Sequence, residues 1–372
     1  MTVRAFLGSH IAALSTRYDV DVVLDSAAES IAADGLRIAV VHRARIRRTV
    51  SPVADCLGVL QLARIFRRGR YAAVHSFTSK AGLLSALAGF IAGVPVRVHN
   101  FTGQVWATRT GPWRLLLRAL DTLIARLDTH VLSDSASQLE FLRENGVLGR
   151  EQGAVLARGS LSGVDTARFR ADAALRVRTR SELDIPGDAL VFVFLGRMKR
   201  DKGVLDLARA FGQIASDRGD LYLLCVGPDE DALAEEVRAA CGPAATRLRA
   251  VAGWTSTPER YIAASDVACL PSYRESFGVA IIEAAAAGLP AIGSRIYGIV
   301  DAIEENRTGL LVEAGNVADL AAAMRALAAD GALRARLAGA ARERVIRDFS
   351  KEAVTRAMVD FYERVVPAPP AP

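Results

Sequence analysis

Two glutamates on either side of a short apolar helix start are the first residues whose spacing suggests chemistry. Glu275 and Glu283 are separated by seven residues in the stretch ESFGVAIIE. A buried strand is predicted just before Glu275 and a helix over 279–287. Ligands of parallel α/β sheets bind at the carboxyl ends of strands, so we expect Glu275 there, and Glu283 leans toward the same helix end. Two such acids suit an elongated, hydroxyl-rich ligand; a solvated Glu275 with a helix-capping Glu283 fits equally well.

A turn earlier in the chain carries positive charges, opposite in sign to the two glutamates. The run VFVFLG predicts a strand, and Arg197, Lys199, Arg200 and Lys202 follow it before a second predicted helix. Cations at a strand's carboxyl end, next to a helix amino terminus, are typical of a diphosphate site. Four of them within six residues are expected to repel one another unless an anion binds. An ordinary solvated loop explains Lys199 and Arg200 better than it explains Arg197 and Lys202.

The elements that would position these residues alternate along the chain. Continuous apolar strands separated by Ala/Leu-rich helices predict parallel sheets covered on both faces, and their number predicts two doubly wound domains. The twelve expected strands are 20–24, 37–41, 72–77, 96–100, 129–135, 153–158, 191–196, 222–227, 248–253, 267–271, 290–294 and 309–314.

The predicted domains are 1–165 and 166–350, followed by an amphipathic helix over 351–366 and a disordered tail, 367–372. A first helix is predicted from within RAFLGSHIAALSTRY, with only Met1 to Val3 before it. Because a doubly wound domain opens with a strand, we expect the first strand to be missing from this chain, as a wrongly chosen start codon would cause.

Charge is distributed unevenly between the two predicted domains. Residues 1–165 hold 20 basic and 13 acidic side chains, and the remainder holds 27 and 28. A basic half could face nucleic acid or an anionic membrane, or it could reflect arginine-rich solvation alone. Its basic residues are dispersed and lack an aromatic-interleaved motif, which argues against nucleic acid. The four cysteines are scattered, no secretory leader is seen, and the longest apolar run, 83–96, is too short to span a bilayer.

Together these segments resemble the retaining glycosyltransferases of family 4, which have the GT-B fold. The resemblance covers nearly the whole chain and rests on GRxxxxKG at 196–203, on the Glu-x7-Glu pattern with SFG, and on NRTGLLVEAGNVADLAAAM at 306–324. It implies a nucleotide-diphospho-sugar in the cleft between an N-terminal acceptor domain and a C-terminal donor domain. It also implies that the helix over 351–366 returns to the N-terminal domain.

The resemblance assigns the donor contacts within the C-terminal domain. Arg197 and Lys202 would bind the diphosphate, Glu275 the transferred sugar and Glu283 the ribose. The base would lie near Trp254. The complete expected donor set is Gly196, Arg197, Lys202, Gly253, Trp254, Glu275, Ser276, Phe277, Gly278, Val279 and Glu283.

The expected mechanism follows from the charges that develop as the sugar–phosphate bond breaks. Arg197, Lys202 and the helix amino terminus would stabilise the leaving nucleoside diphosphate, so Glu275, Arg197 and Lys202 are the expected catalytic residues. We expect no cofactor and no catalytic metal, and we regard the pairs Asp19/Asp21 and Asp229/Asp231 as coincidental Asp-x-Asp matches. The anomeric configuration should be retained, without Glu275 acting as a covalent nucleophile.

The N-terminal half resembles a narrower group within the family. Residues 74–142 and 156–169 are similar to bacterial enzymes that extend oligosaccharides on polyprenyl diphosphate for capsule, O-antigen or glycoprotein assembly. Many family 4 enzymes carry His-Gly where this chain has Thr102-Gly103, and GSLSGVD departs from the usual loop at Leu161 and Ser162. The expected acceptor residues are Lys80, Thr102, Gly103, Gln104 and Arg109.

A helical apolar pattern over 113–127 carries arginines and could lie on an anionic membrane, or pack on its sheet as an ordinary helix. Trp106, Arg109 and Trp113 are the stronger candidates for membrane contact. His75 and His99 lie in predicted strands and are expected to be core or cleft-wall residues and not catalysts.

The leading hypothesis is a cytoplasmic, membrane-peripheral glycosyltransferase on the inner face, moving a hexose or N-acetylhexosamine from UDP to a lipid-linked saccharide. Two alternatives remain open. One is a UDP-N-acetylglucosamine epimerase of the same architecture, and the other is a non-catalytic subunit that binds sugar nucleotides.

Overall fold

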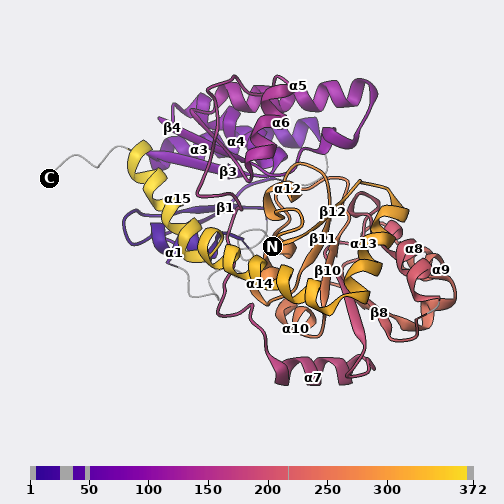
Figure 1. Ribbon diagram of the computed structural model, residues 1–372. Helices are drawn as coiled ribbons and strands as arrows, with labels where there is room; N and C mark the ends of the chain where they lie inside the picture. Colours follow the sequence, from indigo (N-terminus) through magenta and orange to yellow (C-terminus); the bar gives the residue numbers. More distant parts are fainter. Residues whose placement is uncertain (1–5, 26–36, 47–50, 217, 367–372) are drawn as a thin grey trace. The chain divides into compact units, whose positions relative to one another are not determined.

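The computed structural model describes residues 6–25, 37–46, 51–216 and 218–366 (Figure 1). The strand expected to be missing before residue 4 and the expected disordered tail, 367–372, lie outside these residues. The chain folds into two compact units, one formed by residues up to Gly163 with the segment from Lys351, the other by Val164–Ser350. The units are described separately.

The second unit contains a six-stranded parallel sheet with strand order β12-β11-β10-β7-β8-β9. Its strands are β7 (Leu190–Leu195), β8 (Leu221–Gly227), β9 (Leu248–Ala252), β10 (Val267–Leu270), β11 (Ala291–Ser294) and β12 (Gly309–Val312). Its helices are α7 (Ala173–Glu182), η3 (Arg200–Lys202), α8 (Val204–Ala215), α9 (Ala234–Ala240), η4 (Gly242–Arg247), α10 (Pro258–Ala263), α11 (Val279–Ala286), α12 (Ile299–Ala302), α13 (Val317–Ala329) and α14 (Gly331–Asp348).

The strand order reverses between β7 and β10. From β7 the chain proceeds to β8 and β9 on one side, and from β10 it proceeds to β11 and β12 on the other. Because such crossovers are right-handed, the helices that follow β7 and β10 lie on opposite faces of the sheet. Helix α8 accordingly packs with α13, and α11 packs with α14. The unit is therefore doubly wound, and its topological switch point lies between two adjacent strands.

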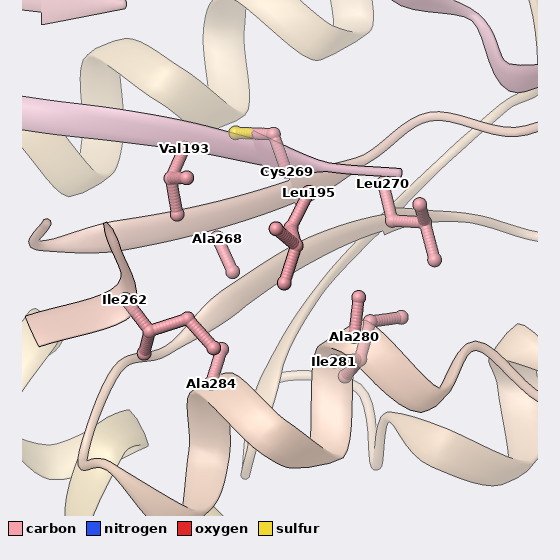
Figure 2. Close-up of a pocket in the computed structure, with 9 residues that line it drawn as sticks. All are labelled: Val193, Leu195, Ile262, Ala268, Cys269, Leu270, Ala280, Ile281 and Ala284. Atoms are coloured by element: carbon pink, nitrogen blue, oxygen red, sulfur yellow. The ribbon is translucent and has the colours of Figure 1, made fainter. Parts of the chain in front are cut away.

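The side chains of helix α11 that face the sheet include two alanines. Ala280 and Ala284 face strands β7 and β10, as Figure 2 shows. The space left between them is a cavity of about 10 Å³ lined by apolar side chains. A cavity of that size, without polar partners, is too small to hold a ligand and is expected to be dry. The interior beneath α11 is thus a packed core, which leaves its amino-terminal end at the sheet edge as the place for chemistry.

In the described residues of the first unit, strands form two parallel sheets, β1-β2 and β3-β4-β5-β6. The strands are β1 (Val22–Leu24), β2 (Val41–Arg43), β3 (Ala73–Phe77), β4 (Val96–Phe101), β5 (His130–Ser133) and β6 (Ala154–Val155). The helices are α1 (Gly8–Leu14), α3 (Pro52–Gly69), α4 (Ser79–Ala92), η2 (Val105–Thr108), α5 (Gly111–Leu127), α6 (Ala136–Glu144) and α15 (Lys351–Val365).

The four-stranded sheet has helices of different origin on its two faces. Its strands pair in sequence order, so right-handed crossovers place α4, α5 and α6 on one face. Helix α15 packs against the same sheet through Phe361, which clusters with Val96, Val98 and Leu132. The chain thus returns to this unit after completing the other one (Figure 1). Among the described helices, none combines the length and apolar composition required to cross a membrane.

Each of the twelve predicted strands overlaps an observed strand, but the one predicted over 153–158 is reduced to Ala154–Val155 and the one over 20–24 begins at Val22. The strand predicted over 37–41 begins only at Val41, where it pairs in register with Val22. Residues before it are mostly exposed, with Val40 47% accessible, although Ala39 N–H already donates to Val20 O at 2.9 Å. The apolar run therefore makes a hydrogen bond to the segment before β1 at Ala39, two residues before the regular strand begins.

Candidate functional site

The candidate site is formed by two loops at the switch point of the second unit's sheet. The loop 196–203 follows β7, and the loop 271–278 follows β10, the strand paired with β7. Because the crossovers from these strands leave in opposite directions, a crevice outside their carboxyl ends is where ligands bind in open α/β sheets. The two segments singled out in the sequence are thereby brought together.

The central contact between these loops is an ion pair. Lys202 Nζ lies 2.6 Å from Glu275 Oε1, and the two side chains are 13% and 17% exposed. The same Glu275 oxygen accepts a hydrogen bond from Ser272 Oγ at 3.1 Å, and Lys202 Nζ also donates to the Arg274 carbonyl at 3.2 Å. The ammonium group has three protons, of which two are engaged here. Glu275 Oε2 accepts no hydrogen bond from the described residues. The pair therefore keeps one donor and one acceptor atom for a ligand.

The other three cations of the basic turn have carboxylate partners as well. Arg197 pairs with Glu230 at 3.1 Å, Lys199 with Asp231 at 3.2 Å, and Arg200 with Glu236 at 2.6 Å. The prediction that these cations would repel one another without a bound anion is therefore wrong. Their partners lie at and beyond the end of the adjacent strand β8, about thirty residues along the chain, and nothing in the local sequence of the turn indicated them. Arg197 remains 46% exposed.

The amino terminus of α11 completes this edge. Gly278 caps the helix in the left-handed region (φ 88°), without a side-chain cap or an acid in the first turn. The main-chain N–H groups of a first helical turn suit an anion, although that of Ile281 already donates to Gly278 O at 2.9 Å. Phe277 is buried against Phe349, with ring centroids 5.1 Å apart, so only its backbone can contact a ligand. Val279 follows as the first helical residue, and Ser276 is half-buried.

A loop that the sequence analysis missed supports this segment. At Gly298 (φ 85°), a Cβ atom would lie 2.6 Å from the Ser276 carbonyl carbon and 2.8 Å from Glu275 O. A side chain there would push against the backbone that presents Glu275. The only signal in the sequence was an isolated glycine in IYGIV, after the next strand, β11.

Glu283 lies on α11 one turn beyond its start and is half-buried. Burial raises the pKa of its carboxyl group to about 7; the Arg168 charge acts in the lowering direction and Glu259 in the raising direction. Its carboxyl group has no hydrogen-bond partner among the described residues. A group of this kind can accept hydrogen bonds from ligand hydroxyls, which would favour its charged form.

Three further predicted donor residues lie at the same sheet edge. Gly196 follows β7, and its N–H donates to Val226 O at 3.0 Å. Gly253 follows β9 in the left-handed region (φ 96°), and its N–H donates to Gly227 O at 3.2 Å. Trp254, next in the chain, is 58% exposed. An exposed indole beside an open backbone offers a stacking surface for a planar base.

The predicted acceptor residues of the first unit are dispersed by comparison. Thr102 and Gly103 follow β4 and are half-buried, and Arg109 is exposed after η2. Lys80, in the first turn of α4, pairs with Asp55 at 2.7 Å. Gln104 is 1% exposed, and its Oε1 accepts a hydrogen bond from Gln138 Nε2 at 3.2 Å. The structure thus places two of these residues in intramolecular contacts.

Trp106 corrects a second prediction. It was expected to contact a membrane, but it is 1% exposed, stacks on Phe141 with centroids 5.1 Å apart, and donates from Nε1 to Asp121 Oδ2 at 2.7 Å. Burial raises the pKa of Asp121 to about 6, while the Trp106 hydrogen bond opposes that rise. Trp113, by contrast, is 65% exposed, as expected for a surface contact.

Of the two histidines in predicted strands, His99 is buried and His75 is half-buried. His99 is fully buried, and burial lowers its pKa to about 3. His75 contacts the Tyr362 hydroxyl at 3.0 Å through Nδ1, and burial together with the charge of neighbouring histidines lowers its pKa to about 3. Both are neutral at physiological pH, inside the first unit.

Three of the four aspartates in the two Asp-x-Asp matches have structural partners. Asp229 accepts the N–H groups of Leu233 and Ala234 at the start of α9, and Asp231 accepts the N–H of Arg200. Asp21 contacts His42 at 3.0 Å and accepts a hydrogen bond from Tyr71. Within the described ranges, no group of three or more His, Cys, Asp or Glu side chains is arranged to hold a metal ion.

Two family models match this chain and together cover most of it. The family described as "Glycosyl transferases group 1" matches residues 176–344, and the family described as "Glycosyl transferase 4-like domain" matches residues 3–159. The first of these ranges contains every predicted donor residue.

Curated relatives are similar over different lengths. The capsular polysaccharide biosynthesis glycosyltransferase CapM of Staphylococcus aureus is 25% identical over 328 residues, which are 87% of this chain and 84% of CapM. A D-inositol 3-phosphate glycosyltransferase of Streptomyces avermitilis is 35% identical over 55% of this chain and 46% of its own. The lipopolysaccharide core biosynthesis glycosyltransferase LpsD of Rhizobium meliloti is 33% identical over 50% and 53%. The chain thus spans most of CapM but about half of the other two.

Solved structures share the fold over nearly the full chain. HepE of Anabaena, in complex with UDP and glucose, has a TM-score of 0.78 at 20% identity and covers 96% of this chain and 95% of its own. Sucrose-phosphate synthase of Thermosynechococcus elongatus has a TM-score of 0.77 at 22% identity, covering 96% and 91%. At these identities the likeness concerns the fold.

Proposed function

Because the chain belongs to the glycosyltransferases of the family 4, GT-B type, we propose that it transfers a hexose or N-acetylhexosamine from a UDP-linked donor to a lipid-linked saccharide. The observation that carries the proposal is the Lys202–Glu275 pair at the switch point. It combines one free donor proton for a phosphate with one free carboxylate oxygen for a sugar hydroxyl.

The donor would lie along the carboxyl edge of the second unit's sheet. Lys202 and Arg197 would bind the diphosphate with the first-turn N–H groups of α11, where Val279 begins the helix. Glu275, with the backbone of Ser276 and Gly278, would hold the transferred sugar. Glu283 would accept from the ribose hydroxyls, and the base would stack near Trp254.

These groups would act on the bond between sugar and phosphate. As that bond breaks, negative charge grows on the leaving UDP and positive charge on the sugar. Lys202 and Arg197 are fixed in place by their carboxylate partners, so little reorganisation is needed when the charge appears. The leaving phosphate would take the proton of the acceptor hydroxyl on the same face, which retains the configuration. We propose that no metal ion takes part.

The choice of UDP is supported by the neighbours in structure. HepE, which shares the fold, is described in complexes with UDP, with UDP and glucose, and with UDP-glucose. The exposed indole of Trp254 does not by itself select a base. UDP is therefore proposed for this chain on the basis of those complexes.

The lipid-linked acceptor is supported by relatives named for capsular polysaccharide and lipopolysaccharide core biosynthesis. We propose that the acceptor is a saccharide on polyprenyl diphosphate and that Thr102 and Gly103 contact it. Both lie at the carboxyl end of β4, the ligand edge of a parallel sheet.

We further propose peripheral contact with the inner face of the cytoplasmic membrane, through the outer face of α5. Trp113, Leu115, Leu116 and Leu123 on this helix are 36–65% exposed. A groove of about 460 Å³ runs beside them, and its lining includes Arg118 and Arg126. An exposed Trp/Leu face with arginines matches the pattern of interfacial helices on anionic lipid.

The test of donor binding is thermal unfolding with UDP, GDP, ADP and CMP, each with EDTA. A ligand that binds only the folded state raises the unfolding midpoint, and we expect UDP to do so selectively. Lys202→Ala should lose the shift, while Glu235→Gln, an exposed acid of α9, should keep it. Absence of a shift with every nucleotide in the wild type would sink the proposal. A shift that requires added Mg²⁺ or Mn²⁺ would contradict the metal-free part alone.

A further inference from the structure

A second ion pair runs beside the Lys202–Glu275 pair and joins the same two loops. Arg274 Nη2 donates to Asp201 Oδ2 at 2.9 Å, and the two side chains are 17% and 22% exposed. Asp201 also accepts the Tyr273 N–H on its carbonyl oxygen at 2.9 Å. Asp201 immediately precedes Lys202, and Arg274 immediately precedes Glu275. The loops are therefore joined by two ion pairs in register, 201 with 274 and 202 with 275.

Backbone contacts around these ion pairs hold the two loops close together. At Gly203 (φ 67°), a Cβ atom would lie 2.0 Å from Pro271 O, so the two loops touch directly. The Lys202 hydrogen bond to Arg274 O is a second link between the loops. The Asp201–Arg274 ion pair and the hydrogen bond from Tyr273 N–H to Asp201 O are two more.

The energetics of the Asp201–Arg274 pair indicate a geometric rather than a stabilising role. Partly buried ion pairs contribute little net stability, because desolvation offsets the attraction between the charges. Asp201 Oδ1 is buried and accepts no hydrogen bond from any described residue, which is itself unfavourable. What the pair does supply is a fixed register between the residues that carry Lys202 and Glu275.

We propose that Asp201 is a positioning residue that acts through Arg274 to set the relative placement of Lys202 and Glu275. This inference rests on the proposed donor role of those two residues. Arg197, the α11 amino terminus and Glu283 do not depend on the Asp201–Arg274 contact, so UDP should still bind when it is broken. Transfer should suffer, because a misplacement of about 1 Å at reacting groups lowers rates by about 100-fold.

The experiment compares Asp201→Asn, Arg274→Lys and the double variant with Glu236→Gln. The last breaks the Arg200–Glu236 pair on the same turn, whose side chains are 60% and 51% exposed, and serves as a matched control. UDP release is measured from UDP-glucose, or from whichever UDP-sugar the wild type turns over fastest. The midpoint shift with UDP is recorded in parallel.

Asp201→Asn and Arg274→Lys are each expected to lower kcat about 10- to 100-fold, with KM changed less than about threefold and the UDP shift intact. The double variant should be no slower than the slower single variant, since both act through one contact. Glu236→Gln should match the wild type. Unchanged kcat, losses that multiply in the double variant, or a loss that appears only with a lower unfolding midpoint would overturn the positioning role. A wild type that neither binds UDP nor releases it from any UDP-sugar would instead overturn the proposed function on which this inference rests.

Discussion

The carboxyl edges of the two main sheets hold polar residues in contrasting states. At the edge of the second unit's sheet, Lys202, Glu275 and Glu283 are partly exposed and keep unused hydrogen-bonding capacity. At the edge of the sheet β3–β6, Gln104 and Gln138 are buried and bonded to each other, and Asn100 donates to Asp134 at 2.7 Å. The carboxyl edge of a parallel sheet thus carries the proposed ligand site in one unit and mainly a structural polar network in the other.

The difference teaches where recognition can be inferred from a single chain. A diphosphate and a sugar need charge and unsatisfied acceptors, and the second unit supplies both from two adjacent loops. In the first unit, polar groups at the corresponding edge are occupied in holding loops and strands together. Residues with unused hydrogen-bonding capacity, and not polar residues as such, are the basis of the proposed donor site.

The largest effect is expected where the ligand site would be broken. Lys202→Met or Glu275→Gln should lower sugar transfer by about 100- to 1,000-fold, because each removes a group that acts on charge in the transition state. Initial rates with saturating donor measure this. Each variant should keep a cooperative unfolding transition, which checks that the fold persists. Full activity in either purified variant would show that the donor site lies elsewhere.

Much of the fold could be predicted from the sequence, because continuous apolar runs separated by helices are a local signal. All twelve strands were predicted from such runs, including the short β10 and β12. The loops after β7 and β10 were also identified, since glycines and charges at strand ends are visible in the sequence. Which strands are neighbours is not local, so the direct contact between the two loops appears only in the structure.

What the sequence could not supply is the partner of each charged or aromatic side chain. The cations of the basic turn are paired with Glu230 and Asp231 in the loop after the adjacent strand, β8, and with Glu236 in α9. Trp106 lies in a short 3₁₀ turn, where no periodicity tells the buried side from the exposed one, and its partner Asp121 is fifteen residues away. Partners of this kind depend on packing, which a residue pattern does not contain.

The second prediction tests the structural character of the first unit's polar groups. Trp106→Phe should lower the free energy of unfolding by about 1–3 kcal/mol, because it leaves the buried carboxyl group of Asp121 without its donor. Chemical denaturation measures this. Trp113→Phe, the same change at a 65% exposed position, should alter stability by less than about 0.5 kcal/mol. An equal loss of stability in Trp106→Phe and Trp113→Phe would mean that the buried hydrogen bond of Trp106 contributes nothing beyond what an exposed tryptophan does.

The third prediction concerns Glu283, whose pKa is raised by burial to about 7. The native state binds more protons than the unfolded chain between about pH 4.5 and 7, so this group's contribution to stability is present at low pH and is lost as the pH rises through that window. As the pH rises from 5 to 8, the free energy of unfolding of Glu283→Gln should therefore increase by about 1–2 kcal/mol relative to that of the wild type. Denaturation at several pH values measures it, and the exposed Glu235→Gln should show no such gain.

The same carboxyl group links pH to ligand binding. Ribose hydroxyls would donate to its charged form, so UDP affinity should rise as the pH increases from 6 to 8. Titration of the wild type and of Glu283→Gln with UDP across this range tests the link. A slope that survives in Glu283→Gln would assign the titration to another group and remove Glu283 from the ribose site.

The smallest effect on stability, and a selective one on binding, is expected at the exposed face of α5. Trp113→Ala removes a side chain that is 65% exposed, so the free energy of unfolding should change by less than about 0.5 kcal/mol. If the face lies on lipid, the same change should weaken co-sedimentation with vesicles that contain phosphatidylglycerol, because an interfacial anchor is lost. Arg118→Gln should weaken the same binding and reduce its sensitivity to salt, since it removes a charge that anionic lipid attracts.

Val177→Ala, on the exposed face of α7 in the other unit and 71% accessible, is the matched control for loss of an exposed apolar side chain. Equal vesicle binding in all these variants would rule out lipid contact through the exposed side chains of α5. The first unit would then have no lipid-binding face to compare with the proposed donor site of the second.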